Sequence, residues 1–460
     1  MQNKTIFKKK NFVLFLLIIL GSYLIVRNFD DGFWSDEWAS FYFSNPINLD
    51  LIITGNFIDG SSKYYYIILI WWNKFFGYFP ESIRIFSNFF GILSILIFVK
   101  LSREFKLNNE YLILSLSLYV TNFFVIYYSV EARWYSLSLF LSLLSTYFYI
   151  KSLKKDKYLI FFIFSSILSS LINIFSSVIL ISAIIHSLYY KKNKLFISSL
   201  VAIFLVLIFK LDYILIRLFD SGSIANFTIG TPFIKSFFIG YYFNNFFGNV
   251  VFGGIVLFFV VFIIFYFSSV LLDDYKINFI TLIIFLSYAL PLIYSYLFNP
   301  ILRDRYILFV VPLIIIFLSY FIKNFTNNLF RNMAVYSLII FSLININFHK
   351  VYFTKPPIND ALNIIINSND KNILIESYES HFNNLILFSK FAKKNNIKFY
   401  DNINNLEKFW TICLNSPRFA TSIQVDDKKC FNNEFINTHI LNETIKIPDL
   451  VLRNYKKTLD

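Results

Sequence analysis

The sequence predicts a polytopic α-helical membrane protein with helices in the membrane interface and a small C-terminal α/β domain. Of its 460 residues, 57% are hydrophobic, and the mean hydropathy is +0.59, whereas soluble domains are roughly 45–50% apolar. Apolar runs long enough to cross a bilayer, for which about 20 residues suffice, recur between residues 11 and 348. These runs are continuous rather than alternating, so they predict helices and not the strands of a membrane barrel.

Basic residues indicate the orientation of the chain. Lysine and arginine concentrate in short loops between apolar runs, and these basic loops alternate with loops that contain few basic residues. The basic segments are 4–10, 100–106, 151–157 and 191–194. This is the positive-inside pattern of an inner or plasma membrane protein, and it predicts a cytoplasmic N-terminus and an extracytoplasmic C-terminal domain. The net charge of +14 therefore reports topology and not a nucleic-acid partner.

The apolar runs predict about eleven membrane spans within a transmembrane domain of residues 1–348. The first run lacks a small-x-small cleavage site, so we expect it to be an uncleaved span. Single phenylalanine and asparagine residues carry little weight here because both types are abundant throughout the chain. The expected spans are 11–26, 85–101, 111–128, 135–150, 158–174, 176–190, 195–210, 250–272, 279–298, 306–321 and 333–348.

Two apolar pieces of the first long outer segment are predicted to lie in the interface. The piece 38–53 contains Pro46, which breaks a helix, and the piece 64–79 is interrupted by Asn73 and Lys74, a lysine being costly at the bilayer centre. Counting 64–79 as a span would also spoil the alternation of charge. A third piece, 233–247, has the same interfacial character.

Residues 349–460 form the predicted C-terminal domain. The linker 355–357 leads into expected strands at 372–376 and 397–400 and expected helices at 361–367 and 385–394. Two cysteines, Cys413 and Cys430, fall in this domain, and outside the cytoplasm they allow one disulfide without proving it.

Three polar groups of residues sit at predicted outer ends of spans: Asp36 with Glu37, Glu131 with Arg133, and Arg303, Asp304 and Arg305 with Tyr306. A carboxylate at the membrane rim can accept a proton from an incoming hydroxyl. Arginines at the same depth can bind a phosphate through paired hydrogen bonds and stabilise charge that grows on a leaving group. Their convergence predicts an acid–base site for a lipid-borne substrate.

The same residues also fit plainer roles. The acidic stretch fits a solvated loop with interfacial aromatics, and Glu131 fits a simple pair with Arg133 across a tight turn. Arg303 and Arg305 fit anchors of a span end, with Asp304 neutralising one of them. Arginine on the outer side opposes the positive-inside bias, however, and this favours a specific anionic partner.

The chain resembles the GT-C glycosyltransferases, polytopic enzymes that use polyprenyl-phosphate sugars. Within that group it is most similar to bacterial relatives of the protein O-mannosyltransferases and the lipid A aminoarabinose transferases. The resemblance covers most of residues 1–320 and rests on four stretches: Trp34-Ser35-Asp36-Glu37, Phe76-Gly77 with Ile83-Arg84, Tyr128-Ser129-Val130-Glu131-Ala132-Arg133-Trp134-Tyr135-Ser136, and Arg305-Tyr306 with Val311-Pro312.

The resemblance implies an inverting transfer of a sugar from a polyprenyl phosphate to a hydroxyl of an extracytoplasmic glycan, lipid or protein. It implies Asp36 as catalytic base, with Glu37 as the adjacent candidate, and Arg133 and Arg305 as ligands of the donor phosphate. Arg303 and Lys63 are further candidates for that phosphate, and Glu131 and Tyr306 are expected to support the site. No cofactor is expected, and two carboxylates without a histidine-rich set are weak grounds for a metal.

One departure from the family concerns a Lys- or His-Pro-Pro-Leu element that often precedes the second span. Here Ser61-Ser62-Lys63-Tyr64-Tyr65-Tyr66 takes its place without a proline, which leaves Lys63 as its equivalent.

A transporter or flippase for a lipid-linked glycan is the alternative. Such a protein should carry ionisable groups or broken helices near the bilayer midplane, whereas here the charges lie at span ends, which favours an enzyme. A sensor with an outer ligand domain would not need the acidic first loop.

Overall fold

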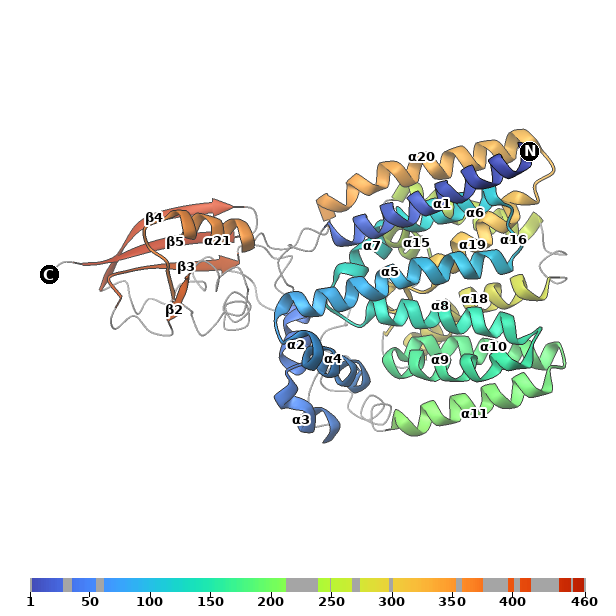
Figure 1. Cartoon of the computed structure of the whole chain (residues 1–460), viewed down its shortest axis with the longest axis horizontal. Helices are drawn as coiled ribbons and strands as arrows, with labels where there is room; N and C mark the ends of the chain where they lie inside the picture. Colours follow the sequence, from blue (N-terminus) through green and yellow to red (C-terminus); the bar gives the residue numbers. More distant parts are fainter. Residues whose placement is uncertain are drawn as a thin grey trace. The chain divides into compact units, whose positions relative to one another are not determined.

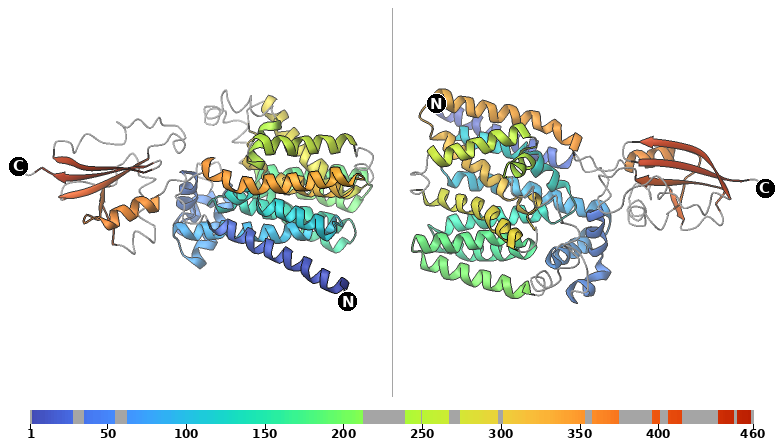
Figure 2. Two further views of the ribbon diagram at one scale, coloured as in Figure 1. Left: turned by 90° about the horizontal axis from the view of Figure 1, so that it is seen from above. Right: turned by 180° about the vertical axis from the view of Figure 1, so that it is seen from behind.

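The computed structural model is mostly helical, with one β-sheet near the C-terminal end (Figures 1 and 2). It describes residues 2–27, 35–54, 62–211, 239–248, 250–266, 274–297, 301–352, 358–374, 396–400, 406–414, 438–447 and 450–458. The chain divides into two compact units. Unit 1 comprises Met1–Val26, Gly60–Tyr65 and Ser87–Tyr352, and unit 2 comprises Arg27–Asp59, Tyr66–Phe86 and Phe353–Asp460.

Unit 1 is a bundle whose long helices lie side by side in all three views (Figures 1 and 2). Each of the eleven expected spans coincides with one described helix or, once, with a bent pair of helices. The helices are α1 (Gln2–Val26), most of α5 (Pro80–Glu104), α6 (Asn109–Val120), α7 (Phe123–Val130), α8 (Tyr135–Ser152), α9 (Leu159–Ile172), α10 (Ser177–Tyr189), α11 (Asn193–Phe209), α15 (Ile239–Phe247), α16 (Val250–Tyr266), α18 (Tyr275–Leu297), α19 (Val310–Lys323) and α20 (Asn328–Tyr352), with 3₁₀ turns η2 (Asp156–Tyr158), η3 (Ile174–Ser176) and η4 (Asp304–Ile307).

Among the described residues, two helices are long and apolar enough to cross a membrane on their own, α5 and α18, and the bent pair would make a third. Shorter apolar helical segments occupy six more of the expected positions: Asn11–Val26, Ile174–Tyr189, Asn193–Phe209, Val250–Phe265, Val310–Lys323 and Asn328–Ile344. The mostly helical architecture is thus confirmed, and the number of eleven spans stays a prediction.

The expected continuous span 111–128 is wrong in one respect, because α6 and α7 meet at a bend of 51°. Asn122 stands at the break, and its side-chain oxygen accepts a hydrogen bond from the backbone N–H of Val125 at 3.0 Å. The hydroxyl of Thr121 donates to the carbonyl of Ser117 at 2.7 Å. These polar side chains offer the backbone partners of their own, so one helix ends and another begins.

The predicted basic loops meet at one end of unit 1, called the inner end here. The Glu104 carboxylate, at the end of α5, lies 2.6 Å from the ammonium of Lys151 and 3.6 Å from that of Lys154. Lys276, at the start of α18, donates to the carbonyl of Glu104. Lysines from separate loops therefore gather around one carboxylate, as expected for loops that face the same side of a membrane.

The helical part of unit 2 contains α2 (Ser35–Phe43), η1 (Pro46–Asn48), α3 (Leu49–Thr54), most of α4 (Lys63–Phe76) and the first turns of α5. The break at Pro46 is confirmed, with Asn45 accepting from the N–H of Ile47 at 3.1 Å. The piece 64–79, expected to be helical, forms helix α4 as far as Phe76. The polar residue within it has partners, since the Asn73 amide donates to the carbonyl and hydroxyl of Ser44, both at 3.0 Å.

The C-terminal part of unit 2 is a small α/β structure, as predicted. Helix α21 (Ile358–Asn367) precedes a five-stranded sheet of order β2-β1-β3-β5-β4. Strand β1 (Asn372–Leu374) pairs in parallel with β2 (Lys398–Tyr400) and β3 (Lys408–Leu414), whereas β5 (Leu450–Lys457) pairs antiparallel with β3 and β4 (His439–Ile447).

Apolar residues cover both faces of this sheet. Ile373 and Leu374 point to opposite faces, as successive strand residues must. Ile373 packs with Trp410 and with Ala361 of α21, and Leu374 packs with Phe409. Strands β3 to β5 were not predicted. The expected linker 355–357, the helix 385–394 and Cys430 lie outside the described residues.

Candidate active site

The three predicted groups of site residues fall in different units. Glu131, Arg133, Arg303, Arg305, Tyr306 and Lys63 belong to unit 1, whereas Asp36 and Glu37 belong to unit 2. Trp34 and the carboxylates Asp30 and Asp31 lie outside the described residues.

A short turn between α7 and α8 carries Glu131 and Arg133. Glu131 ends α7 in an extended conformation, and its carbonyl accepts the N–H of Arg133 at 2.7 Å. Both residues are buried, with 3% and 5% of their surface exposed. Two charged side chains buried in one four-residue turn are costly unless partners compensate them. We call this segment, residues 131–134, the first arginine turn.

A second arginine turn is formed by residues 303–306 at the start of η4. The carboxylate of Asp304 accepts the N–H of Arg305 at 2.7 Å and the side-chain amide of Asn245 at 2.5 Å. The Arg305 guanidinium lies 5.9 Å from the ring centre of Tyr135 and 5.8 Å from that of Tyr306, close enough for cation–π attraction to both. Arg303 is half-buried and directly precedes η4.

The two arginine turns meet around the tyrosines of α7 and α8. Arg305 lies over the ring of Tyr135, and the rings of Tyr135 and Tyr128 lie 4.9 Å apart. The rings of Trp134 and Tyr306 lie 5.7 Å apart. Two of the three groups predicted from sequence are thus brought together within unit 1.

Lys63 begins α4 beside the outer ends of α9 and α11. The hydroxyl of Ser62 donates to the carbonyl of Leu171, and that of Tyr64 donates to the carbonyl of Phe209 at 2.8 Å. The two neighbours therefore fix the backbone of Lys63, which is itself half-buried.

Asp36 and Glu37 begin α2, where carboxylates are favoured by the partial positive charge of a helix N-terminus. Adjacent residues of a helix point about 100° apart, and these two differ accordingly. Glu37 is fully buried and its carboxylate lies 3.4 Å from the guanidinium of Arg84, whereas Asp36 is half-buried. Tyr78 packs close by, donating to the carbonyl of Phe41 at 3.0 Å, and burial raises the pKa of its hydroxyl.

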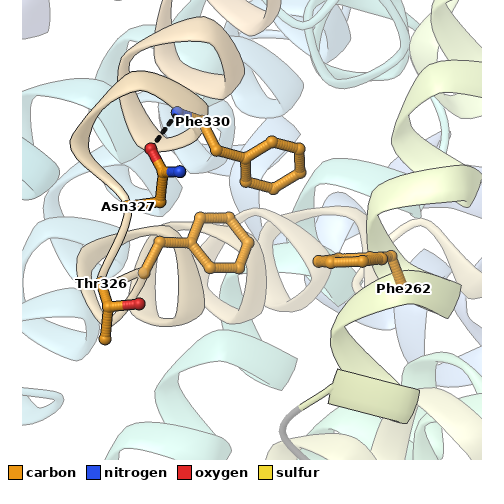
Figure 3. A pocket seen from close by; sticks show the side chains of 5 residues that line it. Phe262, Thr326, Asn327 and Phe330 are labelled. Atoms are coloured by element: carbon orange, nitrogen blue, oxygen red, sulfur yellow. Dashed lines mark hydrogen bonds between the residues drawn. The ribbon is translucent and has the colours of Figure 1, made fainter.

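Cavities at the inner end of unit 1 contain none of the candidate residues. One of about 220 Å³, at the turn between α19 and α20, is lined by three phenylalanines with Thr326 and Asn327 (Figure 3). Another, of about 380 Å³, is lined by Leu153, His186, Tyr190, Lys192 and Tyr275. Among the described residues, no group of three or more His, Cys, Asp or Glu side chains is placed to hold a metal ion.

Sequence reasoning missed Tyr135 and Asn245 as parts of the site, and it gave Arg84 no specific partner. Tyr135 falls within the stretch that carries the family resemblance, and this position could have indicated that it belongs to the site. Nothing in the sequence indicated Asn245, because one asparagine in an asparagine-rich chain is not informative.

No protein-family model matches the sequence, and neither does any curated protein sequence. Solved structures do match the fold. ArnT from Cupriavidus metallidurans bound to undecaprenyl phosphate aligns with a TM-score of 0.52 at 8% identity, over 95% of this chain and 97% of that one. The apo state of that protein gives a TM-score of 0.52 at 8% identity, over 96% and 97%.

An oligosaccharyltransferase from Archaeoglobus fulgidus, in a complex with zinc and sulfate, aligns with a TM-score of 0.51 at 12% identity, over 87% of this chain and 67% of that one. Both proteins are members of the GT-C superfamily. The chain therefore has the GT-C fold, and the resemblance seen in its sequence is confirmed at the level of the fold.

Proposed function

We propose that this protein is a membrane glycosyltransferase that moves a sugar from a polyprenyl phosphate to a hydroxyl of an extracytoplasmic glycan, lipid or protein. The observation that carries the proposal is the meeting of the two arginine turns, in which Arg305 lies over the ring of Tyr135 and Trp134 lies 5.7 Å from Tyr306, in a chain with the GT-C fold. One solved structure with this fold holds undecaprenyl phosphate. This supports a polyprenyl monophosphate as the lipid part of the donor.

The arginine turns supply what binding of a phosphate requires. A guanidinium presents paired N–H donors that match phosphate oxygens, and it keeps its charge at any physiological pH. Tyr135 and Tyr306 hold Arg305 in place, so little ordering is needed when the ligand arrives. Glu131 offsets part of the positive charge while the site is empty. Arg303 and Lys63 are further cations for the same phosphate.

The proposed reaction uses Asp36 as its base, the role that the family resemblance implies. Asp36 takes the proton of the acceptor hydroxyl, whose oxygen attacks the anomeric carbon from the face opposite the phosphate. The bond from that carbon to the phosphate oxygen breaks, and the polyprenyl phosphate leaves with the electron pair, stabilised by Arg133 and Arg305. Attack from the opposite face inverts the configuration of the sugar.

We assign the base to Asp36 rather than Glu37 because of their surroundings. Glu37 is buried against Arg84, and this pairing fits an anchor between α2 and the start of α5. Asp36 is half-buried, so an acceptor hydroxyl can reach it. The positive-inside pattern supports an inner or plasma membrane location with the N-terminus in the cytoplasm and the C-terminal domain outside.

The test is a transfer assay with the purified full chain in lipid nanodiscs. Labelled undecaprenyl-phosphate hexoses and pentoses are offered together with a cell-envelope extract as acceptor. We expect release of undecaprenyl phosphate and label on the acceptor, with loss of both in Asp36→Asn. Lys194→Ala, at an exposed pair with Asp156, is the matched control. Full activity of Asp36→Asn would remove the assignment of the base.

A flippase for a lipid-linked glycan is favoured by one observation, the broken helix at Thr121 and Asn122, since transporters commonly use broken helices. The same assay separates the two functions. A flippase moves the intact lipid across the bilayer and leaves the bond between sugar and phosphate unbroken, so it releases no undecaprenyl phosphate.

A further inference from the structure

Asn173 makes three hydrogen bonds at the junction of α9 and η3. Its side-chain oxygen accepts the N–H of Phe175 at 3.1 Å, which caps η3. Its amide group donates to the carbonyl of Tyr306 at 2.8 Å and to the hydroxyl of Ser138 at 3.1 Å. The residue is buried, with 4% of its surface exposed. One side chain thus ties the second arginine turn to α8.

Asn122 has the same arrangement at the break between α6 and α7. Its oxygen caps α7 through the N–H of Val125 at 3.0 Å, and its amide donates to the carbonyl of Phe246, in α15, at 2.9 Å. It is likewise buried, with 3% exposed. The helix that it caps ends at the first arginine turn.

Helix α15 completes the connection between the two turns. The hydroxyl of Tyr242 donates to the carbonyl of Leu302 at 3.1 Å, and Asn245 donates to the carboxylate of Asp304. Hydrogen bonds therefore run from α7 to α15, from α15 to η4, from η4 to Asn173, and from Asn173 to α8. Helices α7 and α8 are joined directly by the first arginine turn, so the connections form a closed ring.

A capping role alone does not account for both asparagines. Serine, threonine or aspartate caps a helix as well as asparagine does, because only an acceptor oxygen is needed. A side chain that caps a helix and also donates to a distant carbonyl must carry an acceptor and a donor together, and the amide does this. Both buried positions use both functions.

We propose that Asn122 and Asn173 are positioning residues that hold the two arginine turns in register for one phosphate. The expected effect on phosphate binding rests on the proposed function. The expected effect on the order of the two arginine turns does not depend on that function. Asn173 acts through the backbone of Tyr306 on Arg305, and Asn122 acts through α7 and α15 on both turns.

Serine variants test the donor function selectively, because Asn173→Ser and Asn122→Ser keep a capping oxygen and lose the amide. Asn327 offers the matched control. It caps α20 by accepting the N–H groups of Leu329 at 2.9 Å and Phe330 at 3.2 Å, at the inner end of unit 1 (Figure 3). Asn327→Ser removes the same amide far along the helices from both arginine turns.

Two readouts are needed on the full chain in nanodiscs. Hydrogen–deuterium exchange of residues 301–309 should rise in Asn173→Ser and stay as in the wild type in Asn327→Ser. The dissociation constant for undecaprenyl phosphate, measured against undecaprenol, should rise about tenfold in Asn173→Ser, as expected for loss of one buried hydrogen bond. In an Arg305→Ala background, Asn173→Ser should have no further effect on that constant, because the two residues act through one contact.

The outcomes separate the two claims. If the wild type does not distinguish undecaprenyl phosphate from undecaprenol, the proposed phosphate site fails, and the exchange measurement alone decides the positioning role. Unchanged exchange in both serine variants would overturn the positioning role whatever the lipid does. An effect of Asn173→Ser that is undiminished in the Arg305→Ala background would also overturn it.

Discussion

The two ends of the helices of unit 1 both carry charge, but they bury it to different extents. At the inner end, the side chains of Lys151 and Lys154 remain 26% and 46% exposed beside a Glu104 that is 13% exposed. In the first arginine turn, Glu131 and Arg133 are 3% and 5% exposed. Partly exposed charges are screened by water even where they pair, whereas buried charges, Lys276 at the inner end among them (6% exposed), must be held by polar or charged partners.

This difference shows that charge at a helix end can have two functions. The inner lysines follow the positive-inside pattern that is typical of cytoplasmic loops. Arg305 lies over the rings of Tyr135 and Tyr306, and Trp134 of the first arginine turn lies 5.7 Å from Tyr306, so aromatic contacts join the two turns. The comparison predicts that equal removals of charge will have unequal effects at the two ends.

The largest effect is expected from Arg305→Ala and Arg133→Ala. Removing one preorganised donor to a developing negative charge typically costs about 10²–10³ in rate. We expect losses of that size in the transfer assay, whereas Lys151→Ala and Lys154→Ala should retain near wild-type rates. Equal losses at both ends would show that the assay senses overall charge and not a site.

A large effect on stability is expected from Arg84→Ala, because it leaves the Glu37 carboxylate buried without its guanidinium. Breaking a buried ion pair on one side costs about 3–5 kcal/mol in the free energy of unfolding. Thermal unfolding in detergent measures this. Adding Glu37→Gln to Arg84→Ala should recover much of the loss, and a double variant as unstable as Arg84→Ala would contradict the pairing.

A smaller effect is expected from Gly91→Ala in α5. A β-carbon at Gly91 would lie 2.7 Å from the β-carbon of Ser129, so α5 and α7 must separate, and we expect α7 to carry the first arginine turn with it. Overpacking of this kind costs about 1–3 kcal/mol, and the transfer rate should fall as well. Gly254→Ala is the control, because nothing lies within 4 Å of the added carbon. A rate for Gly91→Ala equal to that of the control would show that α7 does not set the position of the turn.

The smallest effect is expected from Lys194→Ala. The side chains of Lys194 and Asp156 are 77% and 68% exposed, although their charged atoms lie 2.6 Å apart. Solvent and salt screen such a pair, so neither the melting temperature nor the transfer rate should change measurably. A clear loss of stability would show that exposure is a poor guide to the value of an ion pair in this protein.

The helices of unit 1 could be predicted from the sequence because each expected span is a continuous apolar run. This pattern depends on burial rather than on detailed packing. The sequence was also sufficient to bring the two arginine turns to the same end, since the alternation of basic loops sets the direction of each helix. Strands β3 to β5 were missed because both faces of the sheet are partly covered, so they lack a clear alternation of apolar and polar residues.

The bend at Asn122 and the junction at Asn173 were missed for a compositional reason. Asparagine is common throughout the chain, and only the structure shows that these two cap one helix while donating to another segment. Glu37 and Asp36 are adjacent in sequence and equivalent as carboxylates, so their different surroundings also required the structure.

The most direct test of the account is an experimental structure of the full chain with undecaprenyl phosphate bound. We predict that the phosphate lies within hydrogen-bonding distance, about 3 Å, of the guanidinium groups of both Arg133 and Arg305. A phosphate bound instead among the lysines of the inner end, or in contact with neither arginine, would contradict it.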